Sequence, residues 1–306
     1  GQHVYFSGTE RSPIELHVYR VRLRDGRLQR LSQAAGTHMP TFNGSMSHYV
    51  DKWNDVNTPD QIRVHKSDGG MTHVVDENRV AVSAPYEIAK PEFLQINTRD
   101  GFPMEAMLIK PPNFDPSKKY PVYQLVYGGP HVQRVLNKWD TNLLRGLFHP
   151  LVAQQGYVVF IVDNRSASGK GAITAWPVYQ KFGEMELRDL EDAAAWLKQQ
   201  PYIDGSRMAM NGWSYGGFMV AYALTHSTTW AAGIAGAPVL DWRDYDSVYT
   251  ERYMRTPKNN PDGYRKSSPR FDAKSLHGRL LLIHGTTDDN VHPQNTLQFA
   301  YDLQQL

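Results

Sequence analysis

The chain has 306 residues, enough for one large domain or two of ordinary size. A hydrophobic fraction of 41% and a charged fraction of 21% are typical of a packed protein and exclude intrinsic disorder. The 33 basic and 31 acidic side chains give a net charge of +2, which argues against a nucleic-acid-binding surface. The absence of cysteine excludes disulfides, thiolate metal sites and thiol nucleophiles, but it leaves the compartment open. No apolar run approaches the roughly 18–20 residues that would span a bilayer.

The first part of the chain, residues 1–90, has the pattern of short strands and tight turns. Apolar and polar residues alternate in residues 3–8 and 15–23. Turn signals follow at Asp25-Gly26, Asn43-Gly44 and Asp68-Gly69-Gly70. This pattern predicts antiparallel sheets, either propeller blades or a sandwich, and the segment is too short to close a propeller by itself. A small β-domain or a β-extension is the alternative.

The second part, residues 91–306, alternates strands with helices, and we place the domain boundary at its start. Strands are expected at residues 93–97, 104–110, 120–127, 157–162, 208–211, 233–235 and 280–284, and helices at residues 187–199 and from residue 216 onward. Strands separated by helices predict an α/β domain, with a mostly parallel sheet and helices on both faces. In such sheets the chemistry lies at the carboxyl ends of the strands.

One of these strand ends carries the pattern G-x-S-x-G, from Gly212 to Gly216. In a strand–turn–helix context this is a nucleophile elbow, in which a strained turn presents the Ser214 hydroxyl. The two glycines avoid collisions with the neighbouring strand and helix. The backbone N–H of Tyr215 at the helix start can stabilise an oxyanion. The alternative is a glycine-rich helix start without catalytic meaning.

A later strand, residues 279–285, leads to Asp288 and Asp289. In this fold class the acid of a catalytic triad follows the serine and precedes the histidine. One of the two aspartates can therefore orient a histidine base, while Asp289 could equally cap the next helix. His292 is expected to be a structural histidine at the start of that helix.

These motifs resemble the prolyl oligopeptidase family of serine peptidases, and within it the dipeptidyl peptidase IV branch. The resemblance rests on four segments: YGGP at residues 127–130, GWSYGG at 212–217, DSVYTERY at 246–253 and HGTTDDNVH at 284–292. It implies the C-terminal blades of a β-propeller in residues 1–90. An α/β-hydrolase peptidase domain would then occupy residues 91–306.

The resemblance also assigns roles to individual residues. It makes Ser214 the nucleophile and Asp288 the triad acid, and it completes the oxyanion hole with the Tyr127 hydroxyl beside the Tyr215 amide. It places Val239, Trp242, Tyr245, Tyr249 and Val291 in the wall of a proline pocket, Asn290 on a substrate carbonyl, and Arg252 near the same pocket. Aromatic rings suit a flat pyrrolidine ring, although ordinary core packing would explain the same aromatic residues.

Some of the family's features differ here or fall outside the sequence. Residues 163–169 carry Ser and Ala where relatives often carry Gly-Ser, which leaves the shape of that loop open. The family's catalytic histidine would fall beyond Leu306, and the acidic pair that captures the substrate's amino terminus would precede Gly1. We therefore expect residues 1–306 alone to be inactive.

The function implied is a serine exopeptidase that releases N-terminal dipeptides after proline, or after alanine, through an acyl-enzyme. The alternatives are a prolyl tripeptidyl or acylaminoacyl peptidase, or a catalytically silent scaffold. The resemblance implies peptide substrates with proline second from the N-terminus, no metal and no organic cofactor. It favours a periplasmic or extracellular location, and it is compatible with a homodimer.

Overall fold

The computed structural model describes residues 1–79, 88–139 and 143–306, which form two compact units. The first unit comprises Gly1–Lys90 and Leu136–Leu151, and the second comprises Pro91–Val135 and Val152–Leu306. Residues 80–87 of the predicted first domain lie outside the described part of the chain.

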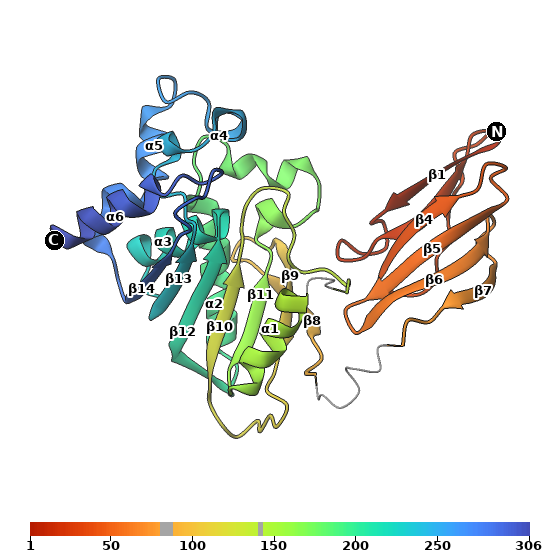
Figure 1. The fold of residues 1–306 in the computed structure, drawn as a ribbon, viewed down its shortest axis with the longest axis horizontal. Coiled ribbons are helices and arrows are strands. Elements are labelled where there is room, and N and C mark those ends of the chain that lie inside the picture. The colour runs from red at the N-terminus through yellow and green to blue at the C-terminus, as the bar shows by residue number, and fades with distance from the viewer. Residues whose placement is uncertain (80–87, 140–142) are drawn as a thin grey trace. The chain divides into compact units, whose positions relative to one another are not determined.

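The first unit contains two antiparallel sheets (Figure 1). The three-stranded sheet has the order β1 (His3–Gly8), β2 (His17–Arg22) and β3 (Leu28–Arg30). The four-stranded sheet has the order β4 (Thr37–Phe42), β5 (His48–Asp55), β6 (Thr58–Lys66) and β7 (Met71–Asp76). The three predicted turn signals lie between β2 and β3, between β4 and β5, and between β6 and β7. The prediction of short antiparallel strands in this segment is confirmed.

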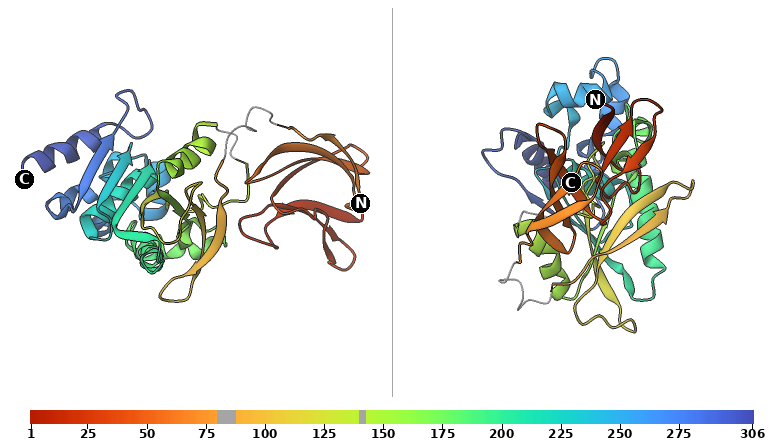
Figure 2. Two further views of the ribbon diagram at one scale, coloured as in Figure 1. Left: turned by 90° about the horizontal axis from the view of Figure 1, so that it is seen from below. Right: turned by 90° about the vertical axis from the view of Figure 1, so that its right-hand side faces the viewer.

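The two sheets of this unit form separate layers joined by aromatic contacts (Figure 2). The rings of Tyr5 on β1 and Phe42 on β4 have centroids 4.6 Å apart. Val18, Leu31 and Tyr49 are buried beside them. These contacts give the unit its own small core.

The second unit is built on a seven-stranded mixed sheet with the order β14-β13-β12-β10-β11-β9-β8. Its strands are β8 (Glu92–Asn97), β9 (Pro103–Ile109), β10 (Tyr120–Val126), β11 (Val158–Val162), β12 (Ile203–Trp213), β13 (Ala232–Gly236) and β14 (Arg279–Ile283). The strands from β10 to β14 pair in parallel, whereas β8 and β9 pair antiparallel at one end of the order. All seven predicted strands are present, and the mostly parallel sheet is confirmed.

Both helices predicted from the sequence, at residues 187–199 and from residue 216, are present as α2 and α3 among the helices of the described residues. Those helices are α1 (Leu143–Gln154), α2 (Glu184–Lys198), α3 (Tyr215–His226), α4 (Ser247–Met254), α5 (Pro261–Lys266) and α6 (Gln294–Gln304). Short 3-10 helices lie at Arg165–Ala167, Ala172–Thr174, Trp176–Val178, Trp242–Asp244 and Pro269–Ser275. The predicted helix at residues 187–199 begins three residues earlier, because Gly183 and Glu186 cap its first turn.

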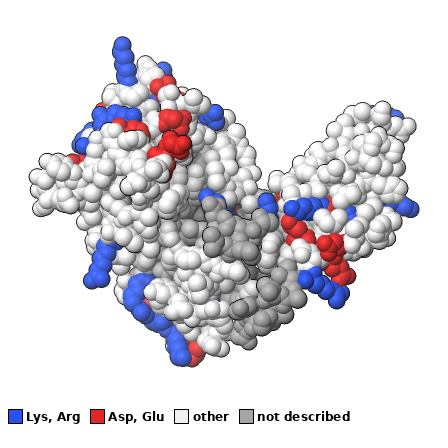
Figure 3. Space-filling view, viewed as in Figure 1, with Lys and Arg blue, Asp and Glu red and all other residues white. Residues whose placement is uncertain are grey.

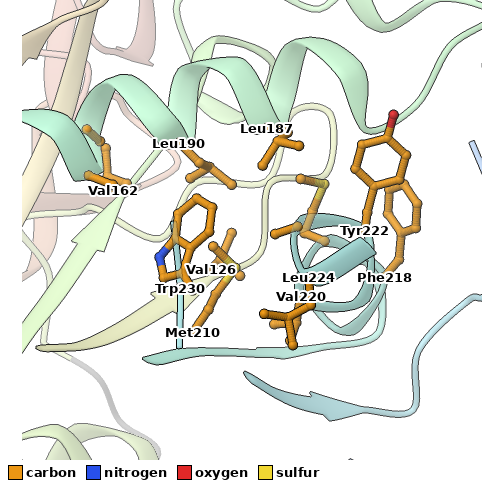
Figure 4. Close-up of a cluster of buried hydrophobic side chains, with 14 of the residues drawn as sticks. Val126, Val162, Leu187, Leu190, Met210, Phe218, Val220, Tyr222, Leu224 and Trp230 are labelled. Carbon is orange, nitrogen blue, oxygen red and sulfur yellow. The ribbon is translucent and has the colours of Figure 1, made fainter. Parts of the chain in front are cut away.

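The core of the second unit lies between α2, α3 and the sheet (Figure 4). Leu187 and Leu190 of α2 face Val126 of β10 and Met210 of β12, and Trp230 fills the space beside them. The Trp230 indole N–H donates to the Gln124 carboxamide oxygen over 2.8 Å, so the indole N–H has its hydrogen-bond partner inside the core. The packed layer fixes the position of α3, whose first residues follow Ser214.

The surface carries mixed charge. Basic side chains on the face shown in Figure 3 lie in small groups, many of them beside acidic ones, as expected from the balanced composition. In the described part of the chain, none of the helices combines the length and apolar character that crossing a bilayer requires.

Candidate active site

The predicted site residues follow the carboxyl ends of neighbouring parallel strands. Val126 at the end of β10 pairs with Gly212 near the end of β12. Trp213, the last residue of β12, pairs with Gly236 at the end of β13, which in turn pairs with Ile283 at the end of β14. Adjacent strands lie about 4.8 Å apart, so the loops that follow them share one edge of the sheet.

Ser214 lies in the tight turn between β12 and α3, where it caps the helix. Its φ of 59° and ψ of −119° put a non-glycine residue in a sparsely populated region, which costs on the order of 1–3 kcal/mol. The Ser214 amide donates to the Gly236 carbonyl over 2.8 Å, and its own carbonyl accepts from Phe218 over 2.9 Å. One tertiary hydrogen bond to β13 and the first bond of α3 thus hold the strained turn that the elbow motif predicts.

Three glycines around Ser214 have no space for a side chain. A Cβ on Gly212 would lie 2.3 Å from the Gly216 carbonyl oxygen, and one on Gly216 would lie 2.4 Å from the Val126 carbonyl oxygen. A Cβ on Gly217 would lie 2.5 Å from the Gly236 carbonyl oxygen. The glycines therefore serve close packing between backbone segments, and the strained serine distinguishes this turn from an ordinary glycine-rich helix start.

Tyr215 contributes its backbone and its side chain to different environments. Its amide is the first of α3, and the first amides of a helix have no acceptor within the helix. Its side chain is buried, and its hydroxyl donates to Glu186 Oε1 over 2.6 Å. The backbone amide is therefore the group of Tyr215 that can stabilise an oxyanion next to Ser214.

Tyr127 directly follows β10 and is half-buried. Its ring lies 6.1 Å from the Tyr215 ring, measured between centroids, and the Arg134 guanidinium carbon lies 4.6 Å from its centroid. Gly129 packs so closely that a Cβ there would lie 2.7 Å from the Tyr127 ring. These contacts hold the Tyr127 ring beside that of Tyr215, and its role as a donor to the oxyanion stays a prediction.

The loop after β11 supports the loop that carries Tyr127. Ser166 Oγ donates to the Gly128 carbonyl over 3.1 Å, and Asn164 Nδ2 donates to Ser166 Oγ over 2.7 Å. Asp163 accepts hydrogen bonds from the amides of Arg134 and Val135. Burial raises the pKa of Asp163 to about 7, against the effect of those two amides. The unusual segment at residues 163–169 is thus a buried polar support.

Asp288 lies in the exposed loop after β14, and its carboxylate is held by the loop's own backbone. Its Oδ1 accepts from the amides of Asn290 over 3.1 Å and Val291 over 2.9 Å. His284 Nε2 approaches the other oxygen, Oδ2, at 3.6 Å. The carboxylate is half-buried, whereas the neighbouring Asp289 is exposed.

The two histidines of this loop have structural contacts. His284 is bonded through Nδ1 to Thr296 Oγ1 and through Nε2 to the Val291 carbonyl, each over 2.7 Å. His292 Nδ1 accepts from the Gln294 amide over 3.2 Å at the start of α6. His284 thus links the loop to α6, and His292 lies at the start of that helix, where the sequence analysis expected a structural histidine.

The predicted pocket residues form one aromatic cluster on Trp242. The centroids of the Tyr215, Tyr245 and Tyr249 rings lie 5.4, 6.0 and 6.4 Å from that of Trp242. Burial raises the pKa of both Tyr245 and Tyr249, so these phenols stay neutral donors. An apolar wall with phenolic edges suits a compact apolar side chain with a polar backbone.

The remaining predicted pocket residues differ in their exposure. Val239 and Val291 are buried. Asn290 is exposed, and its Oδ1 accepts from the Tyr245 hydroxyl over 3.3 Å, which links it to the aromatic cluster. Arg252 is exposed on α4. Its place in the pocket stays a prediction.

Three residues that line this region were missed by the sequence analysis: Phe182, Glu186 and Tyr253. The Phe182 ring contacts those of Trp242 at 4.7 Å and Tyr253 at 5.6 Å. The Gly183 amide donates to Glu186, which is half of a capping box, but glycine lacks the side chain that would make this helix start recognisable in the sequence. The contact of Glu186 with Tyr215 is tertiary and left no local signal.

The architecture agrees with comparisons to known proteins. The sequence model described as prolyl oligopeptidase family matches residues 147–306, and that of the dipeptidyl peptidase IV N-terminal region matches residues 1–60. The chain is 39% identical to a probable dipeptidyl-aminopeptidase B of Aspergillus oryzae, over 97% of this chain and 33% of the relative. A probable dipeptidyl-aminopeptidase B of Botryotinia fuckeliana is 38% identical over 96% of this chain and 32% of the relative.

The structural comparison leads to the same family. The crystal structure of Porphyromonas gingivalis dipeptidyl peptidase 4 matches with a TM-score of 0.91 and 39% identity, covering 99% of this chain and 43% of that one. The chain thus spans about a third of the length of its curated relatives. The predicted fold class, propeller blades followed by an α/β-hydrolase domain, is confirmed. The chain belongs to the prolyl oligopeptidase family, in its dipeptidyl peptidase IV branch.

Proposed function

We propose that the protein carrying this chain is a serine exopeptidase that releases N-terminal dipeptides after proline, and less readily after alanine. The observation that carries the proposal is the strained Ser214 turn, at the same sheet edge as the Tyr127 and Asp288 loops. The names of the relatives, dipeptidyl-aminopeptidase and dipeptidyl peptidase, support the dipeptide cut.

In the proposed reaction, Ser214 Oγ attacks the carbonyl carbon of the second substrate residue while a histidine base takes its proton. The resemblance places that base beyond Leu306, and Asp288 Oδ2 would orient it. The negative charge that develops on the carbonyl oxygen would be stabilised by the Tyr215 amide and the Tyr127 hydroxyl. The C–N bond then breaks, and the leaving amine takes the proton from the histidine.

The second half of the reaction restores the enzyme. Water, deprotonated by the same histidine, attacks the ester carbon. The bond from that carbon to Ser214 Oγ breaks, Oγ takes the proton back from the histidine, and the dipeptide leaves as a carboxylate. The ring of the second substrate residue would lie against Trp242 and Tyr249, whose apolar faces favour proline over longer polar side chains. No metal or organic cofactor takes part in this proposal.

The proposal is tested by the variant Ser214→Ala in the complete protein. We expect it to abolish hydrolysis of a Gly-Pro chromogenic amide and labelling by a fluorophosphonate probe, while the thermal unfolding midpoint stays close to that of the wild type. Retained turnover would overturn the assignment. A wild type that is folded but neither hydrolyses nor labels would instead identify a silent scaffold.

The same assay separates the dipeptidyl cut from its alternatives. Amides carrying a dipeptide, a tripeptide and an N-acylated residue are compared at equal concentration. We expect the dipeptide amide to be hydrolysed with the highest kcat/KM. Preference for the tripeptide or the acylated amide would replace the dipeptidyl assignment with that of a tripeptidyl or an acylaminoacyl peptidase.

A further inference from the structure

A fully buried carboxylate lies beneath the proposed oxyanion site. Glu186 is in the first turn of α2 and has no exposed surface. Its Oε1 accepts from the Tyr215 hydroxyl over 2.6 Å, and its Oε2 accepts from the Gly183 amide over 3.0 Å. Each oxygen therefore has its own donor, and the two donors come from the beginnings of two different helices.

The surroundings of Glu186 disfavour the charged form of its carboxyl group. Burial raises its pKa to about 7, although the hydrogen bonds from Tyr215 and Gly183 act in the opposite direction. Asp189 on the same helix also disfavours the charge, but Asp189 is itself bonded to Arg165. Burial likewise raises the pKa of Tyr215, so the phenol remains the donor in the pair. A buried carboxyl group with a separate donor for each oxygen points to a specific contact rather than to general stability.

Through Tyr215, the carboxylate is connected to the aromatic cluster and to the proposed oxyanion donors. The Tyr215 ring lies 5.3 Å from Phe182, 5.4 Å from Trp242 and 6.1 Å from Tyr127, between centroids. Its amide follows Ser214 and is the proposed backbone donor to the oxyanion. Fixing the phenol at its far end therefore limits rotation of the residue that carries this amide.

We propose that Glu186 is a positioning residue for acyl transfer: by holding the Tyr215 hydroxyl, it orients the Tyr215 amide and the aromatic wall toward the substrate carbonyl. This inference rests on the proposed function. The effect is exerted through Tyr215 alone, because Glu186 is buried and does not reach the substrate. It is therefore expected to appear in the chemical step more than in substrate binding.

The test is a double-mutant cycle between Glu186 and Tyr215 in the complete protein. A glutamine at 186 can accept from only one of the two donors, and its amide group would face the other. We expect Glu186→Gln to lower kcat on a Gly-Pro amide about 10- to 100-fold with KM changed less than about threefold, since displacements near 1 Å cost rates of this order. Tyr215→Phe should lower kcat by a similar factor, and the double variant should lower it no further than the stronger single variant.

Glu184→Gln is the matched control, because Glu184 lies on the same helix with 69% of its side chain exposed. It should retain the wild-type kcat. If the kcat losses of Glu186→Gln and Tyr215→Phe multiply in the double variant, Glu186 acts only as a cap of α2 and the inference is wrong. The inference is also wrong if Tyr215→Phe leaves kcat unchanged. The Tyr215→Phe arm decides alone if Glu186→Gln does not fold. Loss of the proposed function itself is recognised separately, because the wild type and Glu184→Gln would then also be inactive.

Discussion

The Ser214 elbow and the Asp288 loop both present a polar side chain at the end of a parallel strand, but they are held by different forces. The elbow follows β12, inside the sheet, and the helix after it is buried along most of its length. The Asp288 loop follows β14, the last strand of the described order, and most of its residues are exposed. The surrounding core imposes the conformation of the elbow, whereas local hydrogen bonds hold that of the Asp288 loop.

This difference determines what each region can tolerate. Around Ser214, three glycines touch backbone carbonyls of neighbouring segments, so a single methyl group has nowhere to go. Around Asp288, the amides of Asn290 and Val291 are bonded by the aspartate itself, and a Cβ on Gly285 would meet open space. Changes in the elbow should therefore affect folding and activity together, while changes in the loop should affect activity alone.

The largest expected effect is the loss of kcat in Asp288→Asn, a substitution that should leave stability almost unchanged. An asparagine keeps the oxygen that accepts from the amides of Asn290 and Val291, but it loses the charge that stabilises an imidazolium. We expect Asp288→Asn to lower kcat about 10⁴-fold, as for the same change in serine triads. The thermal unfolding midpoint should shift only slightly.

Asp289→Asn is the control for this experiment, because Asp289 is adjacent and exposed. Its kcat on the same Gly-Pro amide should match that of the wild type. An equally large loss in this variant would transfer the role of the acid to Asp289. A large loss of stability in Asp288→Asn would show that the loop depends on its charge.

The next effect concerns the free energy of unfolding. Gly216→Ala places a Cβ 2.4 Å from the Val126 carbonyl oxygen and 3.2 Å from the Tyr127 Cα, both backbone atoms in the central strand region. We expect it to lower the free energy of unfolding of the second unit by about 3 kcal/mol, because backbone must move. Gly285→Ala, with open space around it, should change that free energy by less than about 0.5 kcal/mol. Denaturant unfolding of the two variants measures the difference, and equal losses would show that the elbow is no more constrained than the loop.

The same contrast explains which features the sequence could predict. The strands, the elbow glycines and the order of Ser214 and Asp288 are local patterns, because each depends on periodicity or on a turn. The aromatic wall was named through the family resemblance and not through spacing, since Trp242 and Tyr249 become neighbours only when α4 packs. Glu186 and Phe182 were missed because their contacts join segments that are distant in the sequence.

The smallest expected effect is on the pH dependence of the free energy of unfolding. The buried Glu186 should make the elbow respond to pH more than the exposed loop does. Its pKa in the folded protein is about 7, above the ordinary value of 4.5, so between these values the folded state binds more protons than the unfolded state. The free energy of unfolding therefore falls as the pH rises through this interval and levels off above it. Asp163, whose pKa burial also raises to about 7, contributes in the same direction.

Glu186→Gln removes one of these two contributions. From about pH 5 to about pH 7 we expect the second unit of the wild type to lose about 2 kcal/mol more stability than this variant. Denaturant unfolding at a series of pH values measures both slopes, with Glu184→Gln expected to follow the wild type. Parallel slopes for wild type and Glu186→Gln would mean that the carboxylate keeps its charge on folding. The Tyr215 and Gly183 donors would then outweigh burial, and the elbow would respond to pH no more than the loop does.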